Sequence, residues 1–492
     1  MYYIMKKAKI ELNLENLAYN FEKIREITGH GVNAIPVVKA NAYDIGIYNV
    51  VDRLLRLDIP QTKYFVFALK EGIELRKMFP KLERIFVLNS IFDGDEKFFE
   101  QYSLTPVINN FEQLKLVSKT SIKDVVLQFN TGLNRNGFEV SQTKSVKEYI
   151  DNSKLNVLMI MSHFACADNI KNNVNDRQIE NFRKISEFFP DKNILKGISA
   201  SDGIVNFNLS DFCNTCRPGK ILYGYYEGFK DVISIKSNIR TDGINLYLPF
   251  GINNGIFTEY GNGDCYVLYN GVKIFIKEVL EDRTILDTQD KSLIEKEVVV
   301  LGGSLNLKTF LDNLGMGSME PIARLLSNCD IDTAGFSINT IRKRETEDDS
   351  NFKATYNAKL GQFYSKITEK RIVDEDGIVG YDGLNTIKKH EKLATFFGGY
   401  LDGLSSIASN KNCYVYVKKN DGNYTKCYLC GKISMDQIVI KLTDDDFDNI
   451  DIGNKVIIFD TEHSIDSFKQ NVKKSKKELF YYLGKSSRIE NK

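Results

Sequence analysis

Short apolar runs alternate with longer amphipathic stretches through the first 230 residues of the chain. In the longer stretches, such as 47–57 and 176–189, apolar residues are spaced three and four apart, which is typical of helices packed on one face. This alternation predicts repeated strand–helix units around a parallel sheet, and eight such units indicate a (β/α)8 barrel. The predicted strands are 33–38, 64–68, 84–88, 104–108, 125–129, 157–161, 194–198 and 221–223.

The pattern changes after residue 225 to short runs rich in Val, Ile, Tyr and Thr, interrupted by Gly, Asn and Asp. Such runs at hairpin spacing predict mainly antiparallel β structure. Within this region four segments resemble four later ones, in the same order, which predicts two tandem copies of one β domain. The matching pairs are 250–255 with 398–403, 265–269 with 413–417, 281–285 with 435–439, and 298–302 with 455–459.

These patterns divide the chain into four parts. We predict a barrel at 1–232, a first β copy at 233–335, and a second β copy at 355–492. The stretch 336–354 is charged and poor in apolar residues, which is typical of a solvated linker. Residues 1–14 could belong to the barrel or join the β region. One large irregular β domain is the alternative to a duplication.

Composition narrows the class of partner. The 492 residues include 66 Lys and Arg against 65 Asp and Glu, a formal net charge of +1. Such a balance creates no field that would attract nucleic acid or a membrane surface, so a small-molecule partner is favoured. We find neither a signal-peptide pattern nor an apolar run of membrane-spanning length, and therefore expect a cytoplasmic protein.

The eight cysteines are too sparse for a disulfide scaffold. Two Cys-x-x-Cys pairs, Cys213/Cys216 and Cys427/Cys430, could supply four zinc ligands if the fold brought them together. Each pair lies in or beside an apolar strand-like run, where cysteine behaves as a small apolar residue. We therefore predict no metal site.

Reactive side chains lie beside several predicted barrel strands, where active sites of such barrels form. Lys39, Arg135, His163, Ser201 and Arg217 occupy such positions. Lys39 directly follows two valines, so a partly desolvated amine suited to a Schiff base with an aldehyde cofactor is expected. A lysine that extends outward into water is the alternative.

Two segments beside the predicted seventh and eighth strands favour a phosphate site. Residues 199–203 read Ser-Ala-Ser-Asp-Gly, and 217–219 read Arg-Pro-Gly. Small residues there let backbone N–H groups approach an anion closely, and barrels commonly hold phosphate at this position. Turns without a ligand are the alternative reading of either segment.

Six motifs, in order and spread over most of the chain, resemble those of the alanine racemases. They are Val37-Val-Lys-Ala-Asn-Ala-Tyr43, Asn130-Thr-Gly-Leu-Asn-Arg-Asn-Gly-Phe138, Ser162-His-Phe-Ala-x-Ala-Asp168, Arg217-Pro-Gly-x-x-Leu-Tyr-Gly224, Gly399-Tyr-Leu-Asp-Gly403 and Gly431-Lys-Ile-Ser-Met-Asp-Gln437. The resemblance implies a pyridoxal 5'-phosphate enzyme with a barrel and a β domain. It also implies interconversion of L- and D-alanine, which would supply D-alanine for peptidoglycan.

The resemblance assigns roles to individual residues. Lys39 would carry the cofactor and Tyr400 would be the second base on the opposite cofactor face, with His163, Arg217 and Asp436 completing the catalytic set. The implied cofactor-binding residues are Lys39, Tyr43, His163, Ser201, Arg217, Gly219, Lys220 and Tyr223. Arg135 and Met435 would receive the substrate carboxylate. In this family the tyrosine and methionine come from the neighbouring subunit, which implies a head-to-tail homodimer.

Some positions depart from the family pattern. The first β copy has Ile252 and Glu281 where the second has Tyr400 and Met435, so only the second copy can supply the base. Gln128 stands where many members carry a carbamylated lysine beside the substrate arginine. Asp44-Ile45 replaces the usual Gly-His, and the usual C-terminal tyrosine is missing from 486–492.

Other functions stay open from the sequence. A serine or broad-specificity racemase would share these motifs, and a non-catalytic pyridoxal-phosphate-binding barrel would need the lysine without the opposed tyrosine. A decarboxylase on the same barrel would need a Cys-Glu-x-x-Asp type of run, which we do not find.

Overall fold

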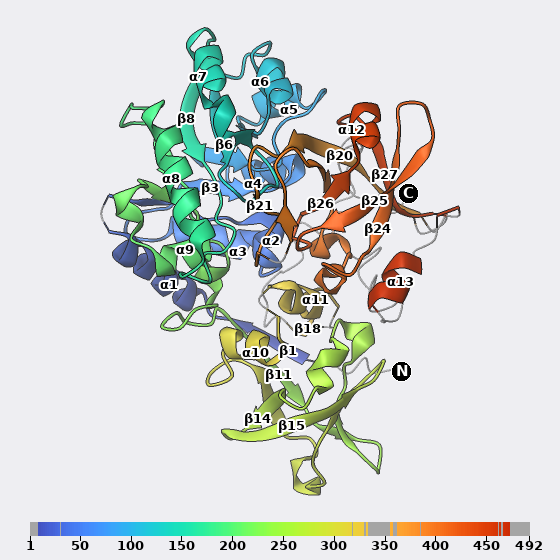
Figure 1. Cartoon of the computed structure of the whole chain (residues 1–492). Helices are drawn as coiled ribbons and strands as arrows, with labels where there is room; N and C mark the ends of the chain where they lie inside the picture. Colours follow the sequence, from blue (N-terminus) through green and yellow to red (C-terminus); the bar gives the residue numbers. More distant parts are fainter. Residues whose placement is uncertain are drawn as a thin grey trace.

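Figure 1 presents the computed structural model of the chain. The structure describes residues 8–29, 31–316, 318–328, 331–332, 355–357, 362–383, 385–460, 462–463 and 466–472. The predicted linker at 336–354 and the chain end at 486–492 lie outside this set. Among the described residues, no helix is both long enough and apolar enough to cross a membrane.

Within the described residues, eight short strands form a closed ring in the blue-to-green part of Figure 1. They are β2 (Asn33–Ala34), β3 (Lys63–Val66), β4 (Arg84–Val87), β5 (Thr105–Ile108), β6 (Asp124–Asn130), β8 (Asn156–Met161), β9 (Leu195–Gly197) and β10 (Thr215–Cys216). Strands β3 to β9 pair in parallel in that order, and β10 pairs with β2. The ring closes where Val37 bridges Phe65 and where Asn214 N–H donates to Lys196 O at 3.0 Å. The predicted (β/α)8 barrel is confirmed.

Apolar side chains occupy the barrel and both faces of its strands. The interior cluster consists of Ile35, Val37, Phe65, Phe86, Val107, Val126, Met159 and Met161. The outer layer consists of α1 (Leu14–Thr28), α3 (Ile47–Leu55), α4 (Leu69–Met78), α5 (Glu96–Gln101), α6 (Phe111–Val117), α7 (Thr143–Asp151), α8 (Asn173–Glu187) and α9 (Ser201–Asn206). Strands buried on both faces have continuous apolar runs, which explains why the sequence revealed them.

The eighth strand is not where we predicted it. Strand β10 lies at Thr215–Cys216, whereas 221–223 belongs to the 3-10 turn η3 (Lys220–Tyr223). The turn is apolar because it packs against α1, where the Asn20 side chain donates to Leu222 O at 2.9 Å. Pro218 has no N–H to continue a ladder. Arg217 therefore follows its strand, at the same end of the barrel as the other candidate residues.

The first β unit follows the barrel directly and lies at the bottom of Figure 1. Its elements are β11 (Ile233–Asn238), β12 (Arg240–Thr241), β13 (Leu246–Leu248), β14 (Tyr266–Tyr269), β15 (Val272–Val279), β16 (Thr284–Leu286), β17 (Glu297–Leu301), α10 (Leu307–Asn313), α11 (Glu320–Asn328) and β18 (Ile331–Asp332). Strand β1 (Ala8–Leu12), which precedes the barrel in the sequence, pairs antiparallel with β11 and extends this sheet. One apolar core runs through the barrel and the first β unit.

The second β unit, orange to red in Figure 1, lies against the barrel and has its own apolar core. Its elements are β19 (Thr355–Asn357), β20 (Gln362–Ile372), β21 (Gly377–Ile378), β22 (Thr386–Ile387), β23 (Lys392–Phe397), β24 (Tyr414–Lys418), β25 (Tyr424–Cys430), β26 (Gln437–Leu442), α12 (Asp444–Asn449), β27 (Lys455–Phe459) and α13 (Asp466–Val472). Strand β20 pairs with both β23 and β27, which closes this sheet into a small barrel.

The two β units share one strand order. The sequence β13-β16-β15-β14-β17-β11 in the first unit recurs as β23-β26-β25-β24-β27-β20 in the second. Each unit also has a 3-10 turn after the first strand of this series: η4 (Ile252–Asn254) follows β13, and η7 (Tyr400–Asp402) follows β23. The units differ at one edge, because β11 pairs with β1 where β20 pairs with β23.

Candidate active site

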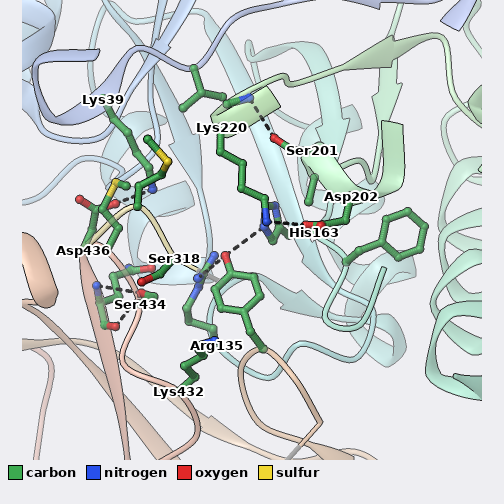
Figure 2. Close-up of a pocket in the computed structure, with 18 of the residues that line it drawn as sticks. Lys39, Arg135, His163, Ser201, Asp202, Lys220, Ser318, Lys432, Ser434 and Asp436 are labelled. Carbon is green, nitrogen blue, oxygen red and sulfur yellow. Dashed lines mark hydrogen bonds and ion pairs between the residues drawn. The ribbon is translucent and has the colours of Figure 1, made fainter. Parts of the chain in front are cut away.

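A cavity of about 450 Å³ lies where the carboxyl ends of the barrel strands meet both β units. Figure 2 shows barrel residues Lys39, Arg135, His163 and Ser201 around it, with Asp436 of the second unit beside Lys39 and Ser434 of the same unit near Asp436. The segment of the first unit just before α11 contributes Ser318 to the wall. All three parts of one chain therefore line the same cavity.

Lys39 opens an unusual backbone turn. The five residues after it, Ala40 to Asp44, all have left-handed backbone conformations, with φ between 54° and 66°. Such conformations cost roughly 1–2 kcal/mol per residue without glycine, so surrounding contacts must hold them. The buried Glu71 carboxylate accepts from Ala40 N–H at 2.8 Å, and the Asn41 side chain accepts from Ile47 N–H at 2.9 Å. These bonds fix the start of the lysine side chain.

The Lys39 amine points into the cavity and not into bulk water. Its Nζ lies 2.5 Å from Oδ2 of Asp436, a second-unit carboxylate that is buried (Figure 2). The same amine lies 5.7 Å from the centroid of the Phe67 ring. The charge partner of the barrel lysine thus comes from the second β unit.

Small residues and hydroxyl groups gather at one end of the cavity. The Ser201 Oγ, at the start of α9, accepts from Gly219 N–H at 3.3 Å and from Ile221 N–H at 3.4 Å. A Cβ atom at Gly219 would overlap the Tyr43 hydroxyl, so only glycine lets the two segments approach. The Ser201 and Tyr43 hydroxyls and the Gly219 backbone thus come together where the phosphate site was predicted, and the phosphate site itself stays a prediction.

Two residues beside this end have different surroundings. The Lys220 Nζ lies 3.3 Å from Asp202 and 4.0 Å from the Tyr225 ring centroid. Tyr223 lies behind Tyr43, with ring centroids 5.2 Å apart, and its buried hydroxyl has no partner in the structure. Tyr223 is therefore placed behind the cavity wall, not on it.

Tyr381 of the second unit links two barrel residues and was not anticipated. Its hydroxyl lies 3.0 Å from Nη1 of Arg135 and 3.0 Å from Nε2 of His163. Burial, together with the charges of Arg135, Arg217 and Lys39, holds the pKa of His163 well below its usual value. The imidazole is consequently neutral. The Nε atom of Arg135 is buried and has no hydrogen-bond partner among the described residues.

Arg217 is fixed by the barrel backbone. Its Nη1 donates to Gly197 O at 2.8 Å and its Nη2 donates to Ser162 O, at the ends of two neighbouring strands. Burial lowers the pKa of Arg217 to about 10, which still leaves a cation at neutral pH. The cavity therefore contains a fixed positive charge beside His163.

The Tyr400 loop is attached to the Met435 segment. Tyr400 N–H donates to Ser434 O at 3.1 Å, and Leu401 N–H donates to Met435 O at 3.3 Å. A Cβ at Gly399 would overlap both carbonyls, so glycine is needed there. Burial raises the pKa of Tyr400 well above its usual value, and nearby Tyr43 and Asp436 add to the effect.

Tyr400 and Met435 line the cavity that holds Lys39 of the same chain. The resemblance predicted that these two residues reach the site from a neighbouring subunit, and the structure instead places them there within one chain.

Of the remaining candidates, Gln128 lines the cavity and the two cysteine pairs do not. Burial raises the pKa of both Cys213 and Cys216, in the barrel, to about 12, and the thiols of Cys427 and Cys430 are buried in β25. In the part of the chain that the structure describes, no group of three or more His, Cys, Asp or Glu side chains is arranged for a metal ion.

Two family models match this chain. Residues 12–227 match the model described as alanine racemase, N-terminal domain, and residues 361–490 match alanine racemase, C-terminal domain. The stretch 228–360 between the two matches contains nearly all of the first β unit. That unit is therefore an addition to the family's two domains.

Individual relatives give the same result. The alanine racemase of Fusobacterium nucleatum is 30% identical over 342 residues, which cover 62% of this chain and 93% of that protein. That of Rickettsia africae is 27% identical over 314 residues, covering 58% and 86%. The crystal structure of alanine racemase from Bartonella henselae with covalently bound pyridoxal phosphate has a TM-score of 0.60 at 20% identity, covering 67% of this chain and 99% of that one. This last likeness shows the fold.

Proposed function

The chain belongs to the alanine racemase family, and we propose on that basis that it is an isomerase that interconverts L- and D-alanine with pyridoxal 5'-phosphate. One observation carries the proposal. An amine, Lys39, and a phenol, Tyr400, come from two different domains and line one cavity of about 450 Å³. Two acid–base groups that approach one carbon from opposite sides can remove a proton from one face and return it to the other.

The residues present fit the cofactor. The hydroxyls of Ser201 and Tyr43 and the space over Gly219 would receive the phosphate, while Lys39 would hold the aldehyde carbon. Arg217 would face the ring nitrogen with its fixed charge. When bound, pyridoxal phosphate withdraws the electrons that remain on the α-carbon after its proton has left.

The protein's own groups would move the proton. Burial raises the pKa of the Tyr400 phenol, so it holds its proton until the proton is delivered to the α-carbon. The Lys39 amine lies 2.5 Å from Asp436, which can stabilise the ammonium form after the amine has taken a proton. Each direction of the reaction would use the same two groups in opposite roles.

Arg135 would orient the substrate. Its guanidinium is held by Tyr381 on one side, while its buried Nε has no hydrogen-bond partner in the part of the chain that the structure describes. A carboxylate is the natural acceptor for such a donor. Tyr381, Tyr400 and Met435 narrow the cavity, which favours an amino acid with a small side chain.

Hydrogen exchange at the α-carbon tests the proposal. The full chain supplied with pyridoxal phosphate should exchange the α-proton of either alanine enantiomer in D2O and produce the other enantiomer, as followed by NMR. Lys39→Ala should lose both this exchange and the absorbance change on borohydride treatment. A wild-type chain that binds the cofactor but does not exchange the proton would contradict the racemase proposal and support a non-catalytic pyridoxal-phosphate-binding protein. Faster exchange on serine than on alanine would identify serine as the substrate.

The finer parts of the proposal are separate predictions. D-alanine made by this enzyme would serve peptidoglycan synthesis, and the enzyme would work in the cytoplasm. The head-to-tail homodimer implied by the resemblance also stays a prediction. The resemblance implies a homodimer because one subunit brings its tyrosine to the site of the other. In the cavity described above, Tyr400 of the same chain already lies in the wall.

A further inference from the structure

The second β unit is joined to the barrel by buried polar contacts. The Asn110 side chain donates to the Glu369 carboxylate at 2.9 Å, and the Asn136 side chain donates to Gln437 at 3.1 Å. Leaving one partner of such a buried pair without its hydrogen bond is destabilising, because the group has lost its contact with water and gained no replacement. Because hydrogen bonds are directional, these contacts fix the orientation of the second unit on the barrel.

A buried ion pair strengthens the same joint. Arg371 of β20 contacts Glu139 of the barrel at 2.8 Å and donates to Gly137 O at 3.1 Å, and its side chain is only 4% exposed. Nearby, the Phe67 ring of the barrel stacks on Phe397 at a centroid distance of 5.4 Å. The joint therefore combines charge pairing with apolar packing around the cavity.

The residues that face the cavity from the second unit are packed outside their own unit's core. Tyr400, Leu401 and Met435 belong to the apolar cluster that runs through the barrel and the first β unit. This cluster includes Ile322 and Leu325 of α11, which lies beside the second unit in Figure 1. The tyrosine is thus held by both other parts of the same chain.

We propose that one chain forms one complete catalytic site, and that catalysis needs no residue from a second copy. The inference rests on the proposed racemase function for its activity readout. The first β unit occupies the sequence between barrel and second unit, which lets the second unit reach the barrel mouth of its own chain. A second chain is then unnecessary even if copies associate.

Complementation separates a site within one chain from a site shared by two. Lys39→Ala and Tyr400→Phe chains with different affinity tags are co-expressed, and the pool and any doubly tagged species are assayed for alanine racemisation. Activity should not exceed the sum of the two variants expressed alone. A doubly tagged species with about half the activity of the doubly tagged wild type would overturn the proposal, because each site would then draw on two chains.

A cross-link tests the same geometry without activity. Ser141 Oγ of the barrel donates to Asp374 Oδ2 of the second unit at 2.5 Å, at the exposed edge of the joint. In a Ser141→Cys/Asp374→Cys variant, oxidation should give a disulfide within one chain, seen on a non-reducing gel at the position of a single chain. A covalent pair of chains would overturn the proposal, and so would the absence of any disulfide, because the joint would not exist. If the wild type does not racemise alanine but the disulfide forms within one chain, the proposed function is rejected and the placement of the second unit on its own barrel stands.

A second observation concerns how the first β unit acts on the tyrosine loop. The Glu320 side chain of α11 is fully buried, and its Oε2 accepts from Ser406 N–H at 3.0 Å and from the Ser406 hydroxyl. Ser406 begins η8 (Ser406–Ala408), in the same loop as Tyr400. The other oxygen, Oε1, lies 2.8 Å from Arg324, whose guanidinium lies 4.2 Å from the Phe257 ring centroid.

We infer that Glu320 is a positioning residue, through which the first β unit sets the orientation of Tyr400. Glu320→Ala should lower kcat/KM roughly tenfold or more, the size expected for losing hydrogen bonds to a charged group. Glu320→Gln, which keeps an acceptor oxygen, should recover part of the loss. Because kcat/KM for the two enantiomers is tied by an equilibrium constant near one, both directions should fall together.

The primary deuterium isotope effect distinguishes positioning from a general loss of stability. If Tyr400 is misplaced, the isotope effect should increase for the enantiomer whose proton the tyrosine removes more than for the other. Glu297→Ala, which removes an exposed carboxylate from the same unit, is the matched control and should change neither quantity. Isotope effects that stay at the wild-type values in Glu320→Ala would overturn the assignment, as would a wild-type kcat/KM.

Discussion

The two β units have the same strand order but differ in what they present to the cavity. In the first unit, Ile252 N–H donates to Leu280 O at 2.9 Å, as Tyr400 N–H donates to Ser434 O at 3.1 Å in the second. Both loops begin at a glycine whose Cβ would overlap the facing backbone. The two loops thus share these backbone contacts although their side chains differ. This indicates that close backbone packing, and not catalysis, requires the glycine.

The units also differ in how they meet the barrel. The first shares an apolar core with it and accepts β1 at its sheet edge, whereas the second closes its own sheet and meets the barrel through buried polar groups as well as apolar contacts. Apolar packing fixes position with little directional demand, whereas hydrogen bonds and ion pairs fix orientation. The comparison indicates that the unit with the phenol needs the more exact placement.

The largest expected difference between the units is in kcat, when the side chains at Tyr400 and Ile252 are replaced. Tyr400→Phe should lower kcat by about 10²- to 10⁴-fold, the usual contribution of a general acid–base group. Ile252→Tyr should not restore activity to the Tyr400→Phe chain, since Ile252 does not line the cavity. A coupled assay of D-alanine formation measures both. Recovery in the double variant would show that the first unit reaches the site.

Removing one arginine from each unit should show how much more a buried ion pair contributes to the free energy of unfolding than a surface ion pair does. Arg371→Met should lower the free energy of unfolding by about 3–5 kcal/mol, because Glu139 would keep a buried charge without its partner. Arg240→Met in the first unit should cost less than about 1 kcal/mol, because its partner Glu295 is 59% exposed. Urea denaturation at one pH gives both values, and equal losses would contradict the distinction.

Glu369 should make the stability of the second unit depend on pH. Burial raises the pKa of this carboxyl from 4.5 to about 8, although Arg371 acts in the opposite direction. Between these values the folded side chain keeps a proton that the unfolded chain releases. The free energy of unfolding should therefore decrease as pH rises from about 4.5 to 8, by up to about 1.4 kcal/mol per pH unit from this group.

The Glu369→Gln variant tests that dependence, because an amide can still accept from Asn110 but cannot ionise. Its unfolding free energy should change less with pH than that of the wild type, with the largest gain in stability near pH 8. Glu375→Gln, at a 54% exposed carboxylate in the same unit, is the control and should follow the wild-type profile. Parallel profiles for Glu369→Gln and wild type would show that the carboxyl ionises normally.

The barrel was largely predictable from sequence because its strands are buried on both faces and therefore read as continuous apolar runs. The eighth strand was not, since Thr215–Cys216 is only two residues long and the apolar turn after it packs on α1. The motifs indicated the cavity residues Lys39 and Tyr400. Their roles remain predictions.

Two features of the site had no signal in the sequence. Tyr381 lies in a short turn between β21 and β22, and its contacts with Arg135 and His163 depend on the docking of another domain. The placement of the second unit on its own barrel is equally invisible, because the order of motifs along a chain does not say which barrel a later domain will cover.

The pairing of β1 with β11 has a consequence for any attempt to shorten the protein. Deleting 228–360 would give a chain of the domain content that the family models describe, yet β1 would lose its antiparallel neighbour and the barrel would lose apolar partners in a shared core. A shortened version of this protein should therefore need compensating substitutions on the surfaces that excision would expose.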